Sequence, residues 1–178
     1  FVLDDGWFGT RDNDDSSLGD WFVNEEKIQG TLNDLAKDIN EMGLKFGLWF
    51  EPEMISPKSK LYEEHPEWCI HVPGRTRNQA RKQLILDLSR EEVCDAIIKM
   101  LKDVLKSAPI SYVKWDMNRN MTEIGSSNLP RERQKEVAHR YMLGLYRIME
   151  TITSEFPEIL FESCSGGGGR FDGGMLYY

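Results

Sequence analysis

Five short apolar runs that each end on a carboxylate are the feature that most restricts the fold of this chain. The runs cover residues 1–5, 46–51, 84–87, 112–116 and 159–162. Short, nearly continuous apolar strands are typical of a parallel sheet that is buried on both faces. The carboxylates would then collect at the carboxyl ends of the strands, where α/β enzymes place their active sites.

Helical patterns separate several of these runs. Apolar residues recur at helical spacing over residues 32–42, 93–105 and 137–152. Gly43 follows the first pattern and is a typical residue after the last turn of a helix. Ser89 and Glu92 match the capping sequence Ser-x-x-Glu ahead of the second pattern. The chain therefore alternates strands and helices, with no linker or internal repeat, which predicts one α/β domain.

Two α/β folds fit this alternation, a doubly wound sheet and a (β/α)₈ barrel. A doubly wound nucleotide-binding sheet would carry Gly-x-Gly-x-x-Gly after its first strand, whereas residues 4–12 here are DDGWFGTRD. Acidic residues at successive strand ends favour the barrel instead. A complete barrel needs about 250 residues. We therefore predict a partial (β/α)₈ barrel of parallel strands alternating with helices, forming a single segment over residues 1–178.

Composition excludes several classes of partner. The net charge is −8 and no dense block of Lys and Arg exists to follow phosphates, so we expect no nucleic-acid partner. The apolar runs are far shorter than the ~18 residues needed to cross a bilayer, so we expect no membrane partner. Three cysteines form an odd and sparse set, which favours a reducing compartment, the cytoplasm. The chain starts at Phe1 inside an apolar run, which suggests a piece of a longer protein.

No cofactor or metal is expected. His65, Cys69 and His71 match no zinc-binding spacing. The glycine-rich run at 163–174 lacks the Lys-Ser/Thr ending of a phosphate loop, so its glycines more plausibly let the backbone pass close to a ligand.

The residue types at the strand ends fit a sugar site. Trp7, Trp49 and Trp115 each lie beside a carboxylate. Packing in the core is the alternative for each tryptophan taken alone. Aromatic faces can stack on the apolar side of a sugar, however, while carboxylates and a lysine hold its hydroxyls. Together these residues favour a carbohydrate ligand.

Lys114 and Asp116 stand two residues apart on one predicted strand, so their side chains point to the same face. A salt bridge at the strand end is one interpretation. Glycoside cleavage offers another, because it normally needs two carboxyl groups. We predict that Lys114 lowers the pKa of Asp116, as suits a nucleophile. The other acidic candidates are Asp4, Asp5, Glu51, Asp87 and Glu162.

Five longer motifs, in order, resemble the α-galactosidases of glycoside hydrolase family 36. They are LDDGWF at 3–8, GLWFEPEM at 47–54, LDLSR at 86–90, YVKWDMNR at 112–119 and ESCSGGGGRFD at 162–172. The resemblance implies a (β/α)₈ catalytic barrel that hydrolyses terminal α-galactosides of the melibiose and raffinose type. It also implies a retaining mechanism through a covalent galactosyl-enzyme intermediate.

The same resemblance implies roles for individual residues. Asp116 would be the nucleophile. Asp4 and Asp5 would bind the galactose 4- and 6-hydroxyls, and Trp49 would form a wall of the site. The other residues implied to bind substrate are Lys114, Asn118, Cys164 and Gly166, the last two near the 2-hydroxyl. An arginine ahead of LDLS also binds sugar in the family; Arg81 fits by distance and Arg77 by its RNQ context, and we choose Arg81.

The resemblance implies that several parts of the family fold lie outside residues 1–178. These are the first barrel strand, the later strands and the flanking β-domains. By the same resemblance, the general acid would lie on an aspartate pair beyond the glycine-rich loop, so we expect the isolated segment to be inactive. We also expect the parent protein to be a homo-oligomer. The alternatives are a sugar-binding fragment without turnover, an α-N-acetylgalactosaminidase and a transglycosylase resembling raffinose synthase.

Overall fold

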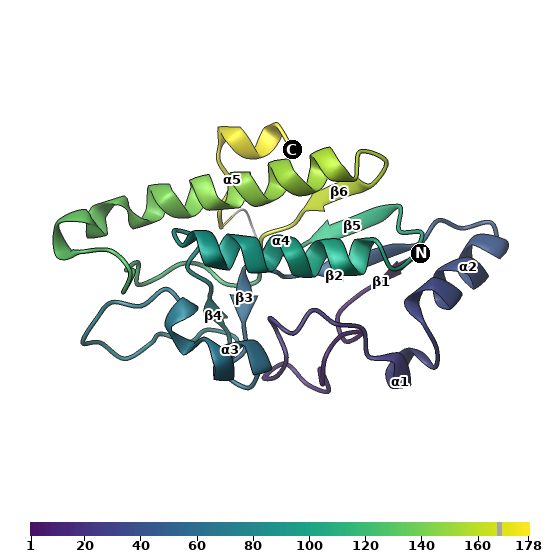
Figure 1. Ribbon diagram of the computed structural model, residues 1–178, viewed down its shortest axis with the longest axis horizontal. Helices are drawn as coiled ribbons and strands as arrows, with labels where there is room; N and C mark the ends of the chain where they lie inside the picture. The colour runs from purple at the N-terminus through teal and green to yellow at the C-terminus, as the bar shows by residue number, and fades with distance from the viewer. Residues whose placement is uncertain (167–168) are drawn as a thin grey trace.

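A four-stranded parallel sheet forms the centre of the computed structural model, which describes residues 1–166 and 169–178 (Figure 1). The strands are β1 (Val2–Leu3), β2 (Gly47–Phe50), β5 (Tyr112–Trp115) and β6 (Leu160–Ser163), in the spatial order β1-β2-β5-β6. Each neighbouring pair is parallel. Four of the five predicted runs are therefore confirmed as parallel strands.

A helix of ten or more residues precedes each strand of the parallel sheet after the first. Helix α2 (Leu32–Glu41) connects β1 to β2, α4 (Glu91–Leu105) leads into β5, and α5 (Val137–Glu155) connects β5 to β6. Helices α4 and α5 lie side by side on one face of the sheet (Figure 1). This alternation of parallel strands and helices confirms the α/β prediction for the segment.

The boundaries of α2 agree with the sequence pattern. The Thr31 side chain accepts a hydrogen bond from the backbone N–H of Asp34 and so caps the first turn. Gly43 has φ = +81°, a conformation that glycine adopts without steric cost, and it follows the last turn as predicted. Leu32, Ala36 and Ile39 bury one face of the helix.

The run at 84–87 was predicted wrongly as a strand of the parallel sheet. Strand β4 (Leu84–Ile85) pairs antiparallel with β3 (Met54–Ile55) in a separate two-stranded sheet. All four residues of this pair are buried. An apolar run shows that a segment is buried but does not show which strand it pairs with.

The capping pair Ser89–Glu92 was also wrong. Arg90 is the residue that precedes α4, and no side chain caps the helix. Ser89 donates a 2.5 Å hydrogen bond to the Asp87 carboxylate instead. The Ser89 hydroxyl, which the sequence pattern assigned to the start of the helix, therefore binds the Asp87 carboxylate.

Shorter elements occupy the long connections. Two lie in the β2-to-β5 connection: α3 (Lys60–Glu64) and the 3₁₀ helix η1 (Pro66–Trp68). The others are α1 (Glu25–Ile28), η2 (Arg131–Glu136) and η3 (Gly173–Leu176). Figure 1 shows β3, β4 and α3 grouped together beyond one end of the parallel strands.

Aromatic side chains form the part of the core next to the strand ends. Trp7, Phe8, Trp21, Trp49 and Phe50 are each at most 3% exposed and contact one another through neighbouring rings. Trp115 is likewise buried. The core-packing interpretation is therefore confirmed for Trp7 and Trp115.

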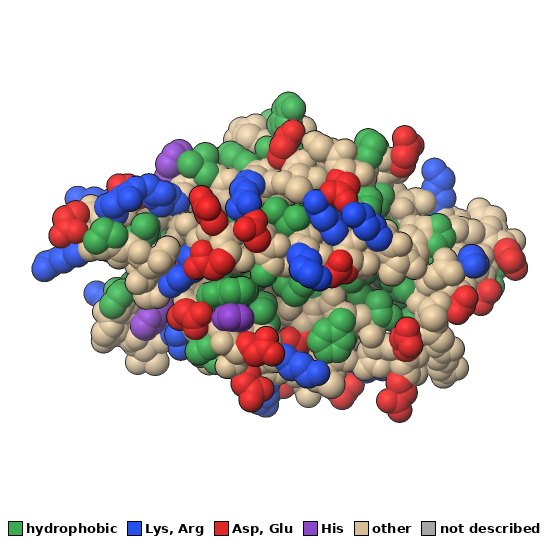
Figure 2. Space-filling model, in the orientation of Figure 1, with side chains coloured by type: hydrophobic (Ala, Val, Ile, Leu, Met, Phe, Trp, Pro, Cys, Tyr) green, Lys and Arg blue, Asp and Glu red, His purple; other side chains and the backbone are tan. Residues whose placement is uncertain are grey.

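The outer surface of α4 and α5 carries acidic and basic side chains intermixed (Figure 2). Arg147 of α5 pairs with Asp95 of α4 at 2.5 Å, and Lys102 of α4 pairs with Glu155 of α5 at the same distance. Within the described residues, no helix combines the length and the hydrophobicity that a membrane span requires.

Candidate active site

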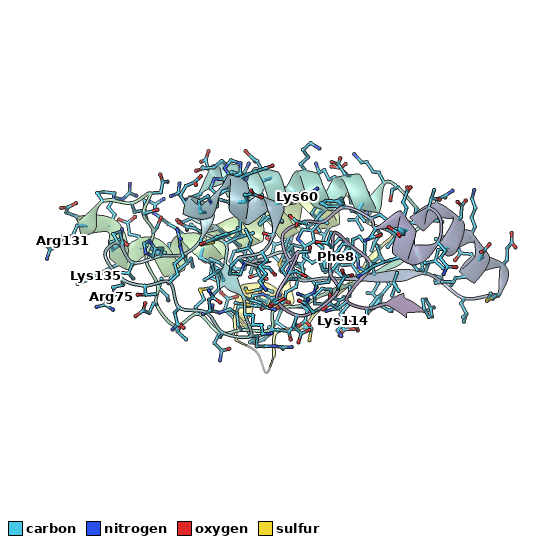
Figure 3. All side chains as sticks on the ribbon, turned by 90° about the horizontal axis from the view of Figure 1, so that it is seen from below. Phe8, Lys60, Arg75, Lys114, Arg131 and Lys135 are labelled. Carbon is cyan, nitrogen blue, oxygen red and sulfur yellow. The ribbon has the colours of Figure 1, made fainter. Side chains whose placement is uncertain are left out.

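The carboxyl ends of the four parallel strands bring polar side chains to one end of the sheet. Asp4 follows β1, Glu51 follows β2, Asp116 follows β5 and Cys164 follows β6. Lys114 of β5 lies on the side of the sheet opposite α4 (Figure 3). The site is thus separated from the helical layer by the sheet itself.

Asp116 is held by donors from three directions. Trp49 Nε1 donates to Asp116 Oδ2 at 3.1 Å, and Asn118 Nδ2 donates to the same oxygen at 2.7 Å. The backbone N–H of Met117 donates to Oδ1 at 2.8 Å. The Cys164 thiol is a further hydrogen-bond partner. These contacts fix the carboxylate in one orientation, with only 5% of the residue exposed.

The donors decide the charge of Asp116. Burial opposes its ionisation, but the hydrogen bonds from Trp49, Cys164, Asn118 and Met117 outweigh burial and lower the pKa below its ordinary value. Asp116 is therefore a carboxylate near neutral pH. An ionised, oriented and mostly buried carboxylate is what nucleophilic catalysis by an acid side chain requires.

Lys114 pairs with a different aspartate from the one predicted. Its Nζ donates to Asp4 Oδ2 at 3.3 Å, across the strands β1, β2 and β5. The low pKa of Asp116 comes from hydrogen-bond donors, and Lys114 is not among its principal causes. The prediction that Lys114 lowers the pKa of Asp116 was wrong because the Asp4 carboxylate takes the ammonium group.

Asp5 is oriented by Arg11, a residue that the sequence analysis missed. Arg11 Nε and Nη2 donate to the Asp5 carboxylate at 3.0 and 2.8 Å. Such a two-point contact fixes the plane of the carboxylate. The arginine in DDGWFGTR was the available signal, since it follows the aspartate pair within one turn-rich stretch. Asp4 and Asp5 therefore have separate cationic partners.

Glu51 lies between the strand ends and the connection 80–83. It is 1% exposed. Its Oε1 accepts the backbone N–H of Asn118 at 2.5 Å, and its Oε2 accepts Gln83 Nε2 at 3.2 Å. Burial raises the pKa of Glu51 to about 7. Two carboxyl groups with pKa values displaced in opposite directions, Glu51 and Asp116, thus share this end of the sheet.

The two candidate arginines lie in different surroundings. Arg77 donates to the Tyr62 hydroxyl at 2.9 Å and to the Pro66 carbonyl at 2.7 Å, so its guanidinium is held by α3 and η1. Arg81 is exposed and near enough to Glu51 to favour ionisation of that carboxyl. The role of Arg81 as the sugar-binding arginine stays a prediction.

Arg81 occupies a strained turn. Arg81 and its neighbour Lys82 have φ = +51° and +60°, and the turn is closed by backbone hydrogen bonds between Ala80 and Gln83. Non-glycine residues in this region cost conformational energy. The turn therefore exposes two adjacent basic residues, of which Arg81 has its charge near Glu51.

The glycine-rich loop approaches Asp116 from β6. Gly166 has φ = +49°, and a Cβ there would lie 3.5 Å from the Met117 carbonyl oxygen. Cys164 adjoins Asp116, and its pKa is raised by burial and by that carboxylate, so the thiol stays protonated. Residues 167–168, which the sequence analysis placed in the same close-approach run, lie outside the described residues.

Trp49, which the resemblance implies to be a wall of the site, is part of the aromatic core, and its contact with sugar stays a prediction. It is 3% exposed, and the rings of Phe8 and Trp21 lie 6.2 and 6.1 Å away. Its ring faces therefore pack in the core. What Trp49 presents to the site is its N–H group, which holds Asp116.

A second buried carboxylate, Glu53, joins the strands to the glycine-rich loop. Arg170 Nε and Trp115 Nε1 donate to Glu53 Oε1 at 2.7 and 3.1 Å. The Tyr141 hydroxyl of α5 donates to Oε2 at 2.5 Å. The sequence analysis missed this network, although two glutamates around a proline and an arginine after the glycines were visible.

Asp87 does not belong to the site. It is fully buried and accepts hydrogen bonds from Ser89 and Ser126 at 2.5 Å. Glu162, in contrast, is exposed on β6, where it is the register partner of Lys114. Asp116 differs from Glu51, the other buried candidate at the strand ends, because its donors lower its pKa whereas burial raises the pKa of Glu51.

The fold and this site define an α/β segment with carboxylates, a lysine and a thiol at the ends of its parallel strands. A model of the Melibiase family matches residues 1–178. The chain belongs to the Melibiase family.

The similar proteins are α-galactosidases of glycoside hydrolase family 36. The α-galactosidase AgaA of Geobacillus stearothermophilus is 70% identical over 177 residues, which cover 99% of this chain and 24% of that protein. The crystal structure of AgaB from the same organism superposes with a TM-score of 0.96 at 69% identity, over 100% of this chain and 25% of that one.

A structure of an AgaA variant contains raffinose. It is 70% identical with a TM-score of 0.94, over 99% of this chain and 25% of that chain. The chain thus spans about a quarter of the length of the relatives it matches.

Proposed function

We propose that the protein containing this chain is a retaining α-galactosidase that hydrolyses terminal α-galactosides such as melibiose and raffinose. The observation that carries the proposal is the state of Asp116, which is ionised, oriented by Trp49 and Asn118, and placed at a strand end. The raffinose complex of an AgaA variant supports the substrate class. The four strands would supply half of a (β/α)₈ barrel.

The reaction would proceed in two displacements. An Asp116 oxygen attacks the anomeric carbon while the glycosidic oxygen leaves with a proton from a general acid, which forms a galactosyl ester. Water then attacks the anomeric carbon of this ester, gives its proton to the same acid group and restores the Asp116 carboxylate. We infer that another part of the parent protein contributes the general acid.

The remaining side chains would bind galactose hydroxyls. Asp4 with Lys114, and Asp5 with Arg11, are carboxylate–cation pairs that can accept from and donate to neighbouring hydroxyls. Their fixed positions would place the anomeric carbon near Asp116, which is the main benefit of a pre-formed site.

Covalent labelling of the intact gene product tests the assignment. An activated fluoro-galactoside should trap the ester, and peptide mapping should find the label on Asp116. The variant Asp116→Ala should lose the label, whereas Asp95→Ala, an exposed residue of α4, should keep it. A label on Glu162 or Asp87 would overturn the assignment. Binding of galactose without any label would favour a sugar-binding protein.

Galactose is proposed over N-acetylgalactosamine because of the loop beside Asp116. Cys164 adjoins the nucleophile, and Gly166 passes close to the Met117 carbonyl, so this side of the site presents a thiol and backbone atoms, which suit a small hydroxyl at the 2-position. Nitrophenyl α-galactoside should be cleaved in preference to the N-acetylgalactosaminide. Faster cleavage of the latter would exchange the two substrate assignments.

A further inference from the structure

Glu51 is a buried carboxyl group that connects three parts of the candidate site. It follows β2, it holds the nucleophile loop through the backbone N–H of Asn118, and it contacts Gln83 on the turn that carries Arg81. Asn118 in turn donates to Asp116. With 1% of its surface exposed, Glu51 has no access to substrate, so any effect on the reaction acts through its neighbours.

The charges around Glu51 do not favour a carboxylate there. Among residues 1–166 and 169–178, no ion pair within 4.0 Å includes Glu51. Asp116 opposes its ionisation and the exposed Arg81 favours it only from a distance. The Arg119 guanidinium is occupied by the Gln83 and Asn78 carbonyls, at 2.7 and 2.8 Å. A buried carboxylate without a close cation is costly, so a bound proton is the less costly state.

Gln83 supplies an independent indication of that proton. It is 2% exposed, and its Oε1 atom has no hydrogen-bond partner, although its Nε2 lies 3.2 Å from Glu51 Oε2. Rotation of the amide by half a turn exchanges the two atoms. In that orientation a protonated Glu51 would donate to Gln83 Oε1, and the amide nitrogen would take the position in which the oxygen finds no donor.

We propose that Glu51 is a positioning residue that acts with a proton on its carboxyl group, holding the nucleophile loop through Asn118 and sharing the proton with Gln83. The inference rests on the proposed function, because it takes Asp116 as the nucleophile. A neutral Glu51 leaves Asp116 as the only charged member of this carboxyl pair. The displacement of the two pKa values, upward to about 7 for Glu51 by burial and downward for Asp116 by its donors, agrees with this arrangement.

The pH dependence of Asp116 labelling tests the proposal in the intact gene product. An activated galactosyl fluoride is the probe, because fluoride leaves with little help from a general acid. The labelling rate is measured from about pH 5 to about pH 9. In the wild type, the labelling rate should fall as the pH rises through about 7 and Glu51 loses its proton. In Glu51→Gln, the rate should not change in this way near pH 7. Glu63→Gln, which alters an exposed carboxyl of α3, should keep that ionisation.

The labelling rates of two Glu51 variants distinguish a positioning role from a packing role. Glu51→Ala should label about tenfold more slowly, as expected for one lost hydrogen bond, and Glu51→Gln should recover most of that rate. Persistence of the ionisation in Glu51→Gln, or an equal loss of rate in both variants, would overturn the proposal.

Infrared difference titration gives a readout that does not depend on activity. A protonated carboxyl band should disappear as the pH rises through about 7 in the wild type and should be absent in Glu51→Gln. A titration at the ordinary glutamate pKa would contradict the proposal. If the wild type labels no residue at any pH, the proposed function fails, while the infrared result still decides the state of Glu51.

Discussion

Arg170 and Glu53 form a buried ion pair, with Nε and Oε1 separated by 2.7 Å although the two residues are 117 positions apart in sequence. The pair joins the glycine-rich loop to the residue two positions after Glu51. Arg170 also donates to the Ser163 hydroxyl at 3.1 Å and to the Cys164 carbonyl at 3.3 Å. The Arg170 side chain therefore anchors the glycine-rich loop beside Asp116 to Glu53 and to the end of β6.

Removal of the arginine should destabilise the protein strongly. Arg170→Ala leaves the Glu53 charge buried without a cation, and we expect a loss of about 3–5 kcal/mol in the free energy of unfolding. Denaturant unfolding of the intact protein measures it. Arg133→Ala breaks an exposed pair with Glu136 and should cost at most about 1 kcal/mol. Equal losses in both variants would contradict the anchoring role.

Trp49→Phe should weaken the nucleophile while retaining an aromatic core. The variant loses the N–H donor that favours ionised Asp116, so the pKa of Asp116 should rise. Because the ionised form attacks, the acidic limb of kcat/KM should move to higher pH, and kcat/KM should fall about tenfold. Trp68→Phe, which alters a ring stacked on His65, is the control. An unchanged acidic limb would exclude this role for Trp49.

Gly144→Ala should disturb the packing of α5 against the connection between β4 and α4. A Cβ at this position would lie 2.0 Å from the Leu88 carbonyl oxygen and 3.1 Å from Cys94 Sγ. A backbone oxygen cannot move away without shifting the start of α4, so we expect a loss of about 3 kcal/mol in stability. Leu143→Ala removes a half-exposed neighbour and should change stability by less than about 1 kcal/mol. Thermal melting compares the two.

Glu51 should make stability depend on pH. The folded protein binds its proton more tightly than the unfolded chain, because burial raises the pKa from 4.5 to about 7. The contribution of Glu51 is therefore complete below about pH 4.5 and is lost as the pH rises through 7. The difference amounts to about 3 kcal/mol. The free energy of unfolding of Glu51→Gln should not show this decrease over the same pH range. An equal decrease in the variant and the wild type would show that another group causes it.

The sequence predicted the elements that depend on local pattern. The apolar stripe ending at Gly43 located α2, and the runs at 1–5 and 112–116 located two parallel strands. It failed where pairing is decided by distant segments. Leu84 and Ile85 are as apolar as the parallel strands, and only contact with Met54 and Ile55 makes them an antiparallel pair.

The same division applies to the site. Asp116 could be predicted because a carboxylate directly follows its strand. The partner of Lys114 could not, because Asp116 is two residues away in sequence while Asp4 is 110 residues away and adjacent only in the folded sheet. Gln83 and Arg170 act through contacts of the same long-range kind, whereas Arg11 contacts Asp5 only six positions away.

The turn at 80–83 has a consequence for engineering. Two adjacent non-glycine residues with positive φ cost about 1–3 kcal/mol each, and Asn-Gly is the dipeptide that such a turn prefers. Replacing Arg81 and Lys82 by Asn and Gly would therefore make the protein more heat-resistant. It would also remove the guanidinium whose charge favours ionisation of Glu51. The easiest gain in durability thus lies at a position where the proposed recognition of substrate has most to lose.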